Sequence, residues 1–201
     1  MADTGAAYYA EMLRVLSCIH RMSAMALDLP PDYFTPYYTP STQVDFRMAY
    51  YPPVPPDAQN TSAMRFGEHT DYTGFTILHQ DESDVGDLDA GGLQVRLNNQ
   101  WHAVTPQPGT FVVNIGDLYE IWTNGRWRST VHRVMKPPAG SAAASRPRLS
   151  LPFFTGPDND AIIEAMPTCV DENHPAKYKP VKALDHLLRK LAESNVHTAK
   201  D

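Results

Sequence analysis

Nine short segments rich in β-branched and aromatic residues follow one another between residues 42 and 154, with turn residues between them. Segments of this length and composition, bounded by glycine, proline, asparagine or serine, predict the strands of an antiparallel fold. They are TQVDFRMAYY, SAMRFGEHT, GFTILHQ, GLQVRL, QWHAVT, TFVVNIG, LYEIWT, RWRSTVHRVM and PRLSLPFF. We therefore expect a mainly β chain, arranged as a double-sheet jelly roll or a related barrel.

Two of the connections are predicted to be tight hairpins. Asn98-Asn99 joins LQVRL to QWHAV, and Asn124-Gly125 joins LYEIWT to RWRSTVHRV. Asn-Gly between such runs is the strongest short-range hairpin signal. We therefore expect each of these two strand pairs to lie side by side in a sheet.

A helix is expected at each end of the strand region. From Ala6 to Leu29 apolar residues recur at steps of three and four, and Pro30-Pro31 ends the pattern because a proline pair cannot continue a helix. Residues Val181 to Asn195 show the same spacing, and we expect that helix to pack against the barrel wall. The predicted organisation is an N-terminal helix and linker (1–40), a jelly-roll core (41–160) and a C-terminal loop and helix (161–201).

Composition limits the classes of partner. The 201 residues suit one domain, and the formal charge of −6 comes with scattered Lys and Arg, which argues against nucleic acid or an anionic membrane as a partner. Cys18 and Cys169 are far apart in the sequence, which suggests neither a disulfide framework nor a zinc ribbon. No run approaches the roughly 18 apolar residues of a membrane span, and the start lacks the pattern of a secretory signal. We expect a cytoplasmic monomer that binds a small molecule.

Three residues are candidates for a metal site. In GEHTDYTGFT, His69 and Asp71 would project to the same side of a strand, although an ordinary polar strand end would show the same pair. His132, in STVHRV, is the third candidate, because an antiparallel barrel can bring its strand beside the one that carries His69. Two histidines and one carboxylate on an octahedral ion leave three open positions, as non-haem Fe(II) oxygenases require.

A candidate anion site follows on the next predicted strand. Arg148 and Ser150 would share one strand face, where a guanidinium can bind a carboxylate through two hydrogen bonds and a hydroxyl can add a third. A solvated strand charge is the alternative, but the neighbouring LSLPFF indicates a largely buried strand. Phe154 lies on the Arg148 face and is a candidate for lining a substrate pocket. Asp117, which follows the turn in NIGD, is expected to be a turn or cap residue.

Taken in order, these motifs resemble a known family. Over residues 8–192 the chain resembles the 2-oxoglutarate- and Fe(II)-dependent dioxygenases of the isopenicillin N synthase-like family. The motifs are Tyr50-Tyr51-Pro52-Pro53, His69-x-Asp71, Asn114-Ile115-Gly116-Asp117, His132-Arg133-Val134 and Arg148-x-Ser150. Three sets of expectations follow from the resemblance: a double-stranded β-helix (jelly roll) fold; Fe(II) bound by His69, Asp71 and His132; and 2-oxoglutarate held by Arg148, Ser150 and Tyr51. O₂ is the implied oxidant, and ascorbate an optional addition.

The implied reaction is hydroxylation, desaturation or ring closure of a small organic metabolite, with 2-oxoglutarate decarboxylated to succinate. Three alternatives stay open: an Fe(II) oxidase that does not use 2-oxoglutarate, like isopenicillin N synthase or aminocyclopropane carboxylate oxidase; a hydrolytic zinc site; and a non-catalytic jelly-roll fragment. Ala49 stands where many relatives have an asparagine near the cosubstrate. Relatives also carry a further N-terminal region, so we expect either a truncated product or another element that closes that side.

Overall fold

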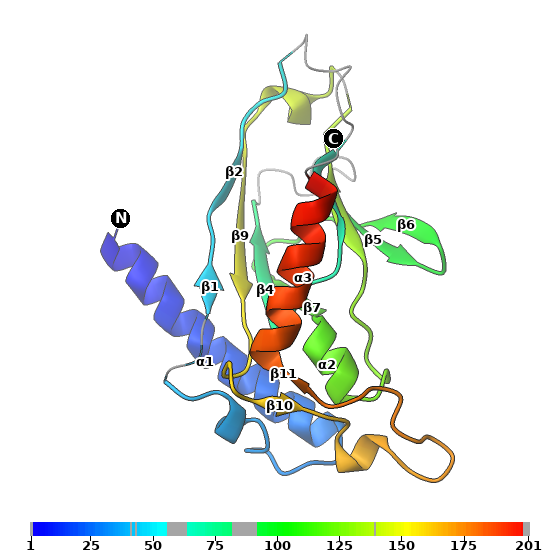
Figure 1. Cartoon of the computed structure of the whole chain (residues 1–201). Coiled ribbons are helices and arrows are strands. Elements are labelled where there is room, and N and C mark those ends of the chain that lie inside the picture. Colours follow the sequence, from blue (N-terminus) through cyan, green and yellow to red (C-terminus); the bar gives the residue numbers. More distant parts are fainter. Residues whose placement is uncertain are drawn as a thin grey trace.

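The computed structural model describes residues 2–40, 42, 44–55, 64–81, 92–138 and 140–198 (Figure 1). Within these residues the chain is mainly β, with antiparallel sheets and few helices, as the sequence predicts. None of the helices in this part of the chain has the length and apolarity that a membrane span needs. The α-helices are α1 (Ala2–Ala26), α2 (Asp117–Trp122) and α3 (Ala183–Thr198).

The strands of the described residues form two larger sheets and one small pair. One sheet has the order β1-β9-β4-β7, with β2 also pairing with β9; the other has the order β3-β8-β5-β6; and β10 pairs with β11. Figure 1 shows α1 crossing near one end of the first sheet, and α3 following β11 at the C-terminal end of the chain. The strand bounds are β1 (Asp45–Phe46), β2 (Ala49–Tyr51), β3 (Met64–His69), β4 (Phe75–Gln80), β5 (Leu93–Leu97), β6 (Gln100–Ala103), β7 (Val112–Ile115), β8 (His132–Met135), β9 (Arg148–Phe154), β10 (Ile162–Ile163) and β11 (Val181–Lys182).

The apolar core lies against one face of the first sheet. Phe75 and Ile77 of β4 and Phe153 of β9 are at most 3% exposed there, packed among residues of α1 and α2. Side chains alternate along a strand, so the residues between them face the other way. We call this second face of the sheet its inner face. It carries the polar residues Thr76 and Gln80 on β4.

The two terminal helices are confirmed, with shifted bounds. α1 ends at Ala26, and Asp28 takes a left-handed backbone with φ of 57° before the two prolines. Val181 belongs to β11 rather than to the final helix, which begins at Ala183. The Asn98-Asn99 hairpin is also confirmed, because both asparagines have positive φ and Leu97 pairs with Gln100 across the turn.

The second predicted hairpin is wrong. LYEIWT forms α2, in which Leu118, Tyr119, Ile121 and Trp122 are buried, a spacing that fits one helical face. Asn124-Gly125 ends this helix: both have positive φ, and the N–H of Gly125 donates to the Glu120 carbonyl at 2.8 Å. The strand predicted after it is correspondingly short and begins only at His132.

Candidate metal centre

His69, Asp71 and His132 come together where the ends of β3 and β8 meet. His69 is the last residue of β3 and pairs with His132, the first residue of β8. Oδ1 of Asp71 lies 3.9 Å from Nε2 of His69 and 3.8 Å from Nε2 of His132. The prediction that Asp71 shares a strand face with His69 is wrong in detail, because Asp71 lies beyond the end of β3. The chain leaves β3 after His69, and the Asp71 carboxylate reaches the two rings from outside the strand.

The carboxylate of Asp71 is oriented by two side chains from the inner face of the first sheet. Thr76 Oγ1 donates to Asp71 Oδ2 at 2.6 Å, and Asn114 Nδ2 donates to the same oxygen. Thr76 pairs with Asn114 across β4 and β7, so the two donors stand next to each other. With Oδ2 held in this way, Oδ1 is the oxygen that faces the histidines.

Both histidines present their Nε2 atoms toward Asp71. Nδ1 of His69 lies 2.9 Å from the Gly67 carbonyl, and Nδ1 of His132 lies 3.0 Å from the Thr130 carbonyl. A carbonyl only accepts, so each Nδ1 carries the hydrogen and each Nε2 keeps its lone pair. Burial, and then the nearby His132, lower the pKa of His69, which favours the neutral ring that a metal needs.

This donor set fits a divalent metal ion. One nitrogen from each ring and one carboxylate oxygen all lie within 4.8 Å of one another, close enough for a single ion to reach all three. Metal ligands in proteins are usually oriented by outer hydrogen-bond partners. Here the Gly67 and Thr130 carbonyls orient the two rings, and the Thr76 hydroxyl and the Asn114 amide orient the carboxylate. Two imidazoles and one carboxylate supply three ligands and leave the remaining octahedral positions open.

A second polar cluster lies on the same inner face. Arg148 and Ser150 of β9 are 3% and 6% exposed, and Arg148 Nη2 donates to Gln80 Oε1 at 3.0 Å. Tyr51 pairs with Arg148 across β2 and β9, and its ring centroid lies 5.5 Å from the guanidinium carbon. Gln80 pairs with Ser150 across β4 and β9. Thr76, which donates to Asp71, lies on the same face of β4 as Gln80, and Leu78 is the residue between them on that face.

Phe154 also lies on this face. It pairs with Thr76 across β4 and β9, two inward positions beyond Ser150 toward the metal candidates. Its half-buried ring therefore lies on the strand position next to Thr76, the residue that donates to Asp71. Arg47 stands over it, with 5.3 Å between the guanidinium carbon and the ring centroid.

Asp117 begins α2, close to its predicted role as a turn or cap residue. Its backbone N–H donates to the Asp71 carbonyl at 2.9 Å. Burial raises the pKa of Asp117, but hydrogen bonds from His186, Ser129 and Lys190, together with the Lys190 charge, more than offset this effect and lower the pKa to about 2. Asp117 is therefore ionised at neutral pH. Its carboxylate also binds His186 and Lys190 of α3, a contact that the sequence did not predict.

Gly116 lets the start of α2 approach the segment that follows Asp71. Its N–H donates to the Gly74 carbonyl at 2.8 Å, and a Cβ at this position would lie 2.6 Å from the Thr73 carbonyl oxygen. We predict that Gly116→Ala lowers the free energy of unfolding by about 1–3 kcal/mol, because backbone has to move. Urea denaturation measures this, with Gly67→Ala, whose Cβ meets nothing within 4 Å, as the control. Equal stabilities for the two variants would contradict the prediction.

Four residues that contact the candidate site residues or their neighbours were not predicted from the sequence: Thr76, Gln80, Ser129 and Lys190. For the first two a signal existed, since Thr76 and Gln80 are polar residues on one face of the predicted strand GFTILHQ. For Lys190 there was none, because the amphipathic pattern of the C-terminal helix marks only its apolar side.

Comparisons with known proteins agree on one family. The sequence profile of the 2OG-Fe(II) oxygenase superfamily matches residues 43–157. Gibberellin 20 oxidase 3 of Arabidopsis thaliana is 36% identical over 165 residues, covering 81% of this chain and 39% of the relative. The chain spans 39% to 57% of the length of the first curated relatives that it matches.

Solved structures give the same result. A full-length Neurospora crassa protein, in complex with alpha-KG and thymine, matches with a TM-score of 0.83 at 32% identity, covering 96% of this chain and 56% of that one. JOX2, in complex with 2OG, Fe and JA, matches with a TM-score of 0.75 at 31% identity, covering 90% of this chain and 49% of that one.

Proposed function

Because this chain belongs to the 2OG-Fe(II) oxygenase superfamily, we propose that it is an Fe(II)- and 2-oxoglutarate-dependent dioxygenase of a small organic metabolite. One observation carries the proposal: two histidines and a carboxylate converge beside the inner sheet face that also carries a buried arginine and serine. A metal site alone would fit several reactions. The second cluster adds a place for an anionic cosubstrate.

The metal ligands in this proposal are His69, Asp71 and His132. When bound, Fe(II) supplies open coordination positions and the one-electron chemistry through which O₂ is used. The chain keeps both Nε2 lone pairs available through the carbonyls behind the rings, and it aims Oδ1 of Asp71 through Thr76 and Asn114. The negative charge of Asp71 also partly neutralises the ion, which two neutral imidazoles cannot do.

We place the distal carboxylate of 2-oxoglutarate against Arg148 and Ser150, with Tyr51 beside them. A guanidinium matches a carboxylate through two parallel hydrogen bonds, and burial strengthens that interaction by excluding water. The contact from Arg148 to Gln80 fixes one end of the guanidinium in advance, which lowers the entropy cost of binding. Phe154 would line the neighbouring substrate space, on the Thr76 side of the same face.

For the fold we propose a double-stranded β-helix, or jelly roll, formed by residues 41–160. Two antiparallel sheets of the described strands support it, since β3 and β8 of one sheet carry the histidines while β4 and β9 of the other carry the supporting and cosubstrate groups. Residues 1–40 and 161–201 would then supply the flanking helices. The oxidised molecule would be a small metabolite, as the name gibberellin 20 oxidase and the thymine bound to the Neurospora crassa protein indicate for those relatives.

Spectroscopy tests the cosubstrate assignment directly. We predict that anaerobic addition of Fe(II) and 2-oxoglutarate produces a weak visible metal-to-ligand charge-transfer band, because the 2-oxo acid chelates the iron. Fe(II) alone and 2-oxoglutarate alone are the controls. Under air, succinate release should accompany consumption of 2-oxoglutarate, which separates this function from that of an iron oxidase that does not use it. Absence of the band in folded, metal-loaded protein would refute the assignment.

A further inference from the structure

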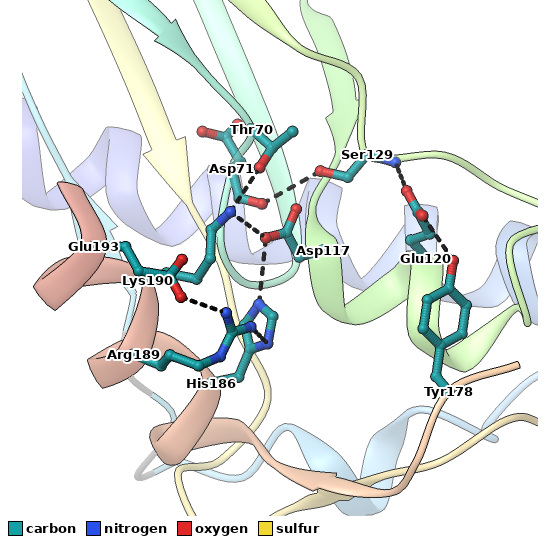
Figure 2. Close-up of polar contacts among 10 residues, drawn as sticks. All are labelled: Thr70, Asp71, Asp117, Glu120, Ser129, Tyr178, His186, Arg189, Lys190 and Glu193. Carbon is teal, nitrogen blue, oxygen red and sulfur yellow. Dashed lines mark hydrogen bonds and ion pairs between the residues drawn. The ribbon is translucent and has the colours of Figure 1, made fainter. Parts of the chain in front are cut away.

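A polar network joins the C-terminal helix α3 to the segment that carries Asp71 (Figure 2). We call residues 70–74 the metal loop. Lys190 Nζ of α3 lies 3.2 Å from Thr70 Oγ1 in this loop and 3.1 Å from Asp117 Oδ2. The same ammonium lies 5.2 Å from the ring centroid of Tyr72. Lys190 therefore contacts the residues on both sides of Asp71 in the sequence.

Asp117 connects the loop and the helix in a second way. Its backbone N–H and the Ser129 hydroxyl both donate to the Asp71 carbonyl, at 2.9 and 3.4 Å. Its carboxylate accepts from α3, through Lys190 and through His186 Nε2 at 3.3 Å. One residue thus holds the backbone of Asp71 with its main chain and α3 with its side chain.

Two residues of α3 contact the Asp117 carboxylate, and these contacts fix the position of the helix along its axis. His186 and Lys190 are four residues apart, on one helix face, and both converge on Oδ2 of Asp117. Arg189 Nη2 lies 3.1 Å from His186 Nδ1, and because arginine only donates, this nitrogen accepts and Nε2 carries the hydrogen toward Asp117. The histidine is 5% exposed. A slide of the helix would break both contacts.

The Lys190–Asp117 ion pair is more buried than an ordinary surface pair. The side chains of Lys190 and Asp117 are 22% and 15% exposed, whereas those of Lys182 and Asp160, which pair just before α3, are 36% and 89% exposed. Exposed pairs contribute little to stability. A largely buried pair loses much of its attraction to desolvation, so its main consequence is to fix geometry.

We propose that Lys190 is a positioning residue for the metal centre, which together with Asp117 uses α3 to hold the metal loop in place. Asp71 needs such support because it lies beyond the end of β3, where none of the described strands pairs with its backbone. Thr76 and Asn114 orient its carboxylate, while Lys190 and Asp117 set where its main chain lies. The inference rests on the proposed function, since it presumes that Asp71 is a metal ligand.

Titration of the apoprotein with Co(II), followed by its visible absorption, tests the inference without requiring turnover. Lys190→Met keeps the aliphatic stem and removes the charge and the polar contacts with Thr70 and Asp117. We expect about 10-fold weaker Co(II) binding and an altered absorption spectrum, since loss of outer partners typically costs 10–100-fold in metal affinity. Asp117→Asn should act in the same direction. The double variant should lose less than the sum of both effects, because the two residues act as one unit.

Lys182→Met is the matched control, because it removes a lysine that pairs with an aspartate beside α3 but does not reach the metal loop. It should bind Co(II) as the wild type does. If Lys190→Met and Asp117→Asn bind Co(II) like the wild type, with the melting temperature of the apoprotein lowered or not, the role is purely structural and the inference is overturned. Wild-type protein that takes up no Co(II) would instead overturn the proposed metal site, and this inference with it.

Discussion

Replacing Asp71 with alanine is expected to abolish turnover. The variant leaves two neutral imidazoles to hold a divalent ion, with no anionic ligand to offset its charge. It also removes the oxygen to which Thr76 and Asn114 donate, so one buried and one half-buried donor lose their acceptor. Because loss of an outer partner alone typically costs 10–100-fold in affinity, we expect metal binding to weaken by at least about 100-fold.

Co(II) titration and a succinate-release assay measure these two losses separately. Asp160→Ala is the control, since that carboxylate is 89% exposed and pairs only at the surface with Lys182. Asp71→Asn separates charge from shape, because the amide keeps the size of the side chain but not its negative charge. Substantial turnover by Asp71→Ala would place the metal elsewhere in the protein.

The metal candidates were found from the sequence by an argument that was only partly right. Strand alternation predicted that His69 and Asp71 share a face, yet only His69 lies in a strand. The pairing of His69 with His132 depends on how β3 and β8 meet, and local pattern cannot predict a contact between residues 63 positions apart. The order of the motifs along the chain carried the prediction, because His69-x-Asp71 alone also suits an ordinary polar strand end.

The error at α2 has a local physical cause. LYEIWT is a short apolar run, and such runs fit a strand or a buried helix equally well. Asn-Gly supplies positive φ, which a hairpin turn and the end of a helix both require. The hairpin at Asn98-Asn99 was predicted correctly because both flanking segments alternate. At Asn124-Gly125 the flanking residues Ile121, Trp122 and Trp127 pack in or against the hydrophobic core, and this packing decides in favour of a helix.

Replacing Arg148 with methionine is expected to weaken 2-oxoglutarate binding far more than it affects the metal. Arg148 is 3% exposed, so its guanidinium would meet the distal carboxylate away from bulk water. Removing one partner of such a buried pair costs about 2–5 kcal/mol. At about 1.4 kcal/mol per tenfold, this corresponds to a dissociation constant roughly 30-fold to several thousand-fold higher. Titration of the charge-transfer band with 2-oxoglutarate measures the change, and Co(II) affinity should stay near that of the wild type.

A cosubstrate analogue shows whether Arg148 binds the distal carboxylate of 2-oxoglutarate. A 2-oxo acid of the same length without the distal carboxylate, 2-oxovalerate, should bind the wild type weakly and bind Arg148→Met about equally weakly. The preference for 2-oxoglutarate should therefore collapse in the variant. Arg14→Met, which removes an exposed guanidinium paired with Glu11 on α1, is the control and should keep the preference. If Arg148→Met still prefers 2-oxoglutarate as strongly as the wild type does, another cation holds the distal carboxylate. The buried arginine would then serve β2, β4 and β9 by binding Gln80 and packing on Tyr51.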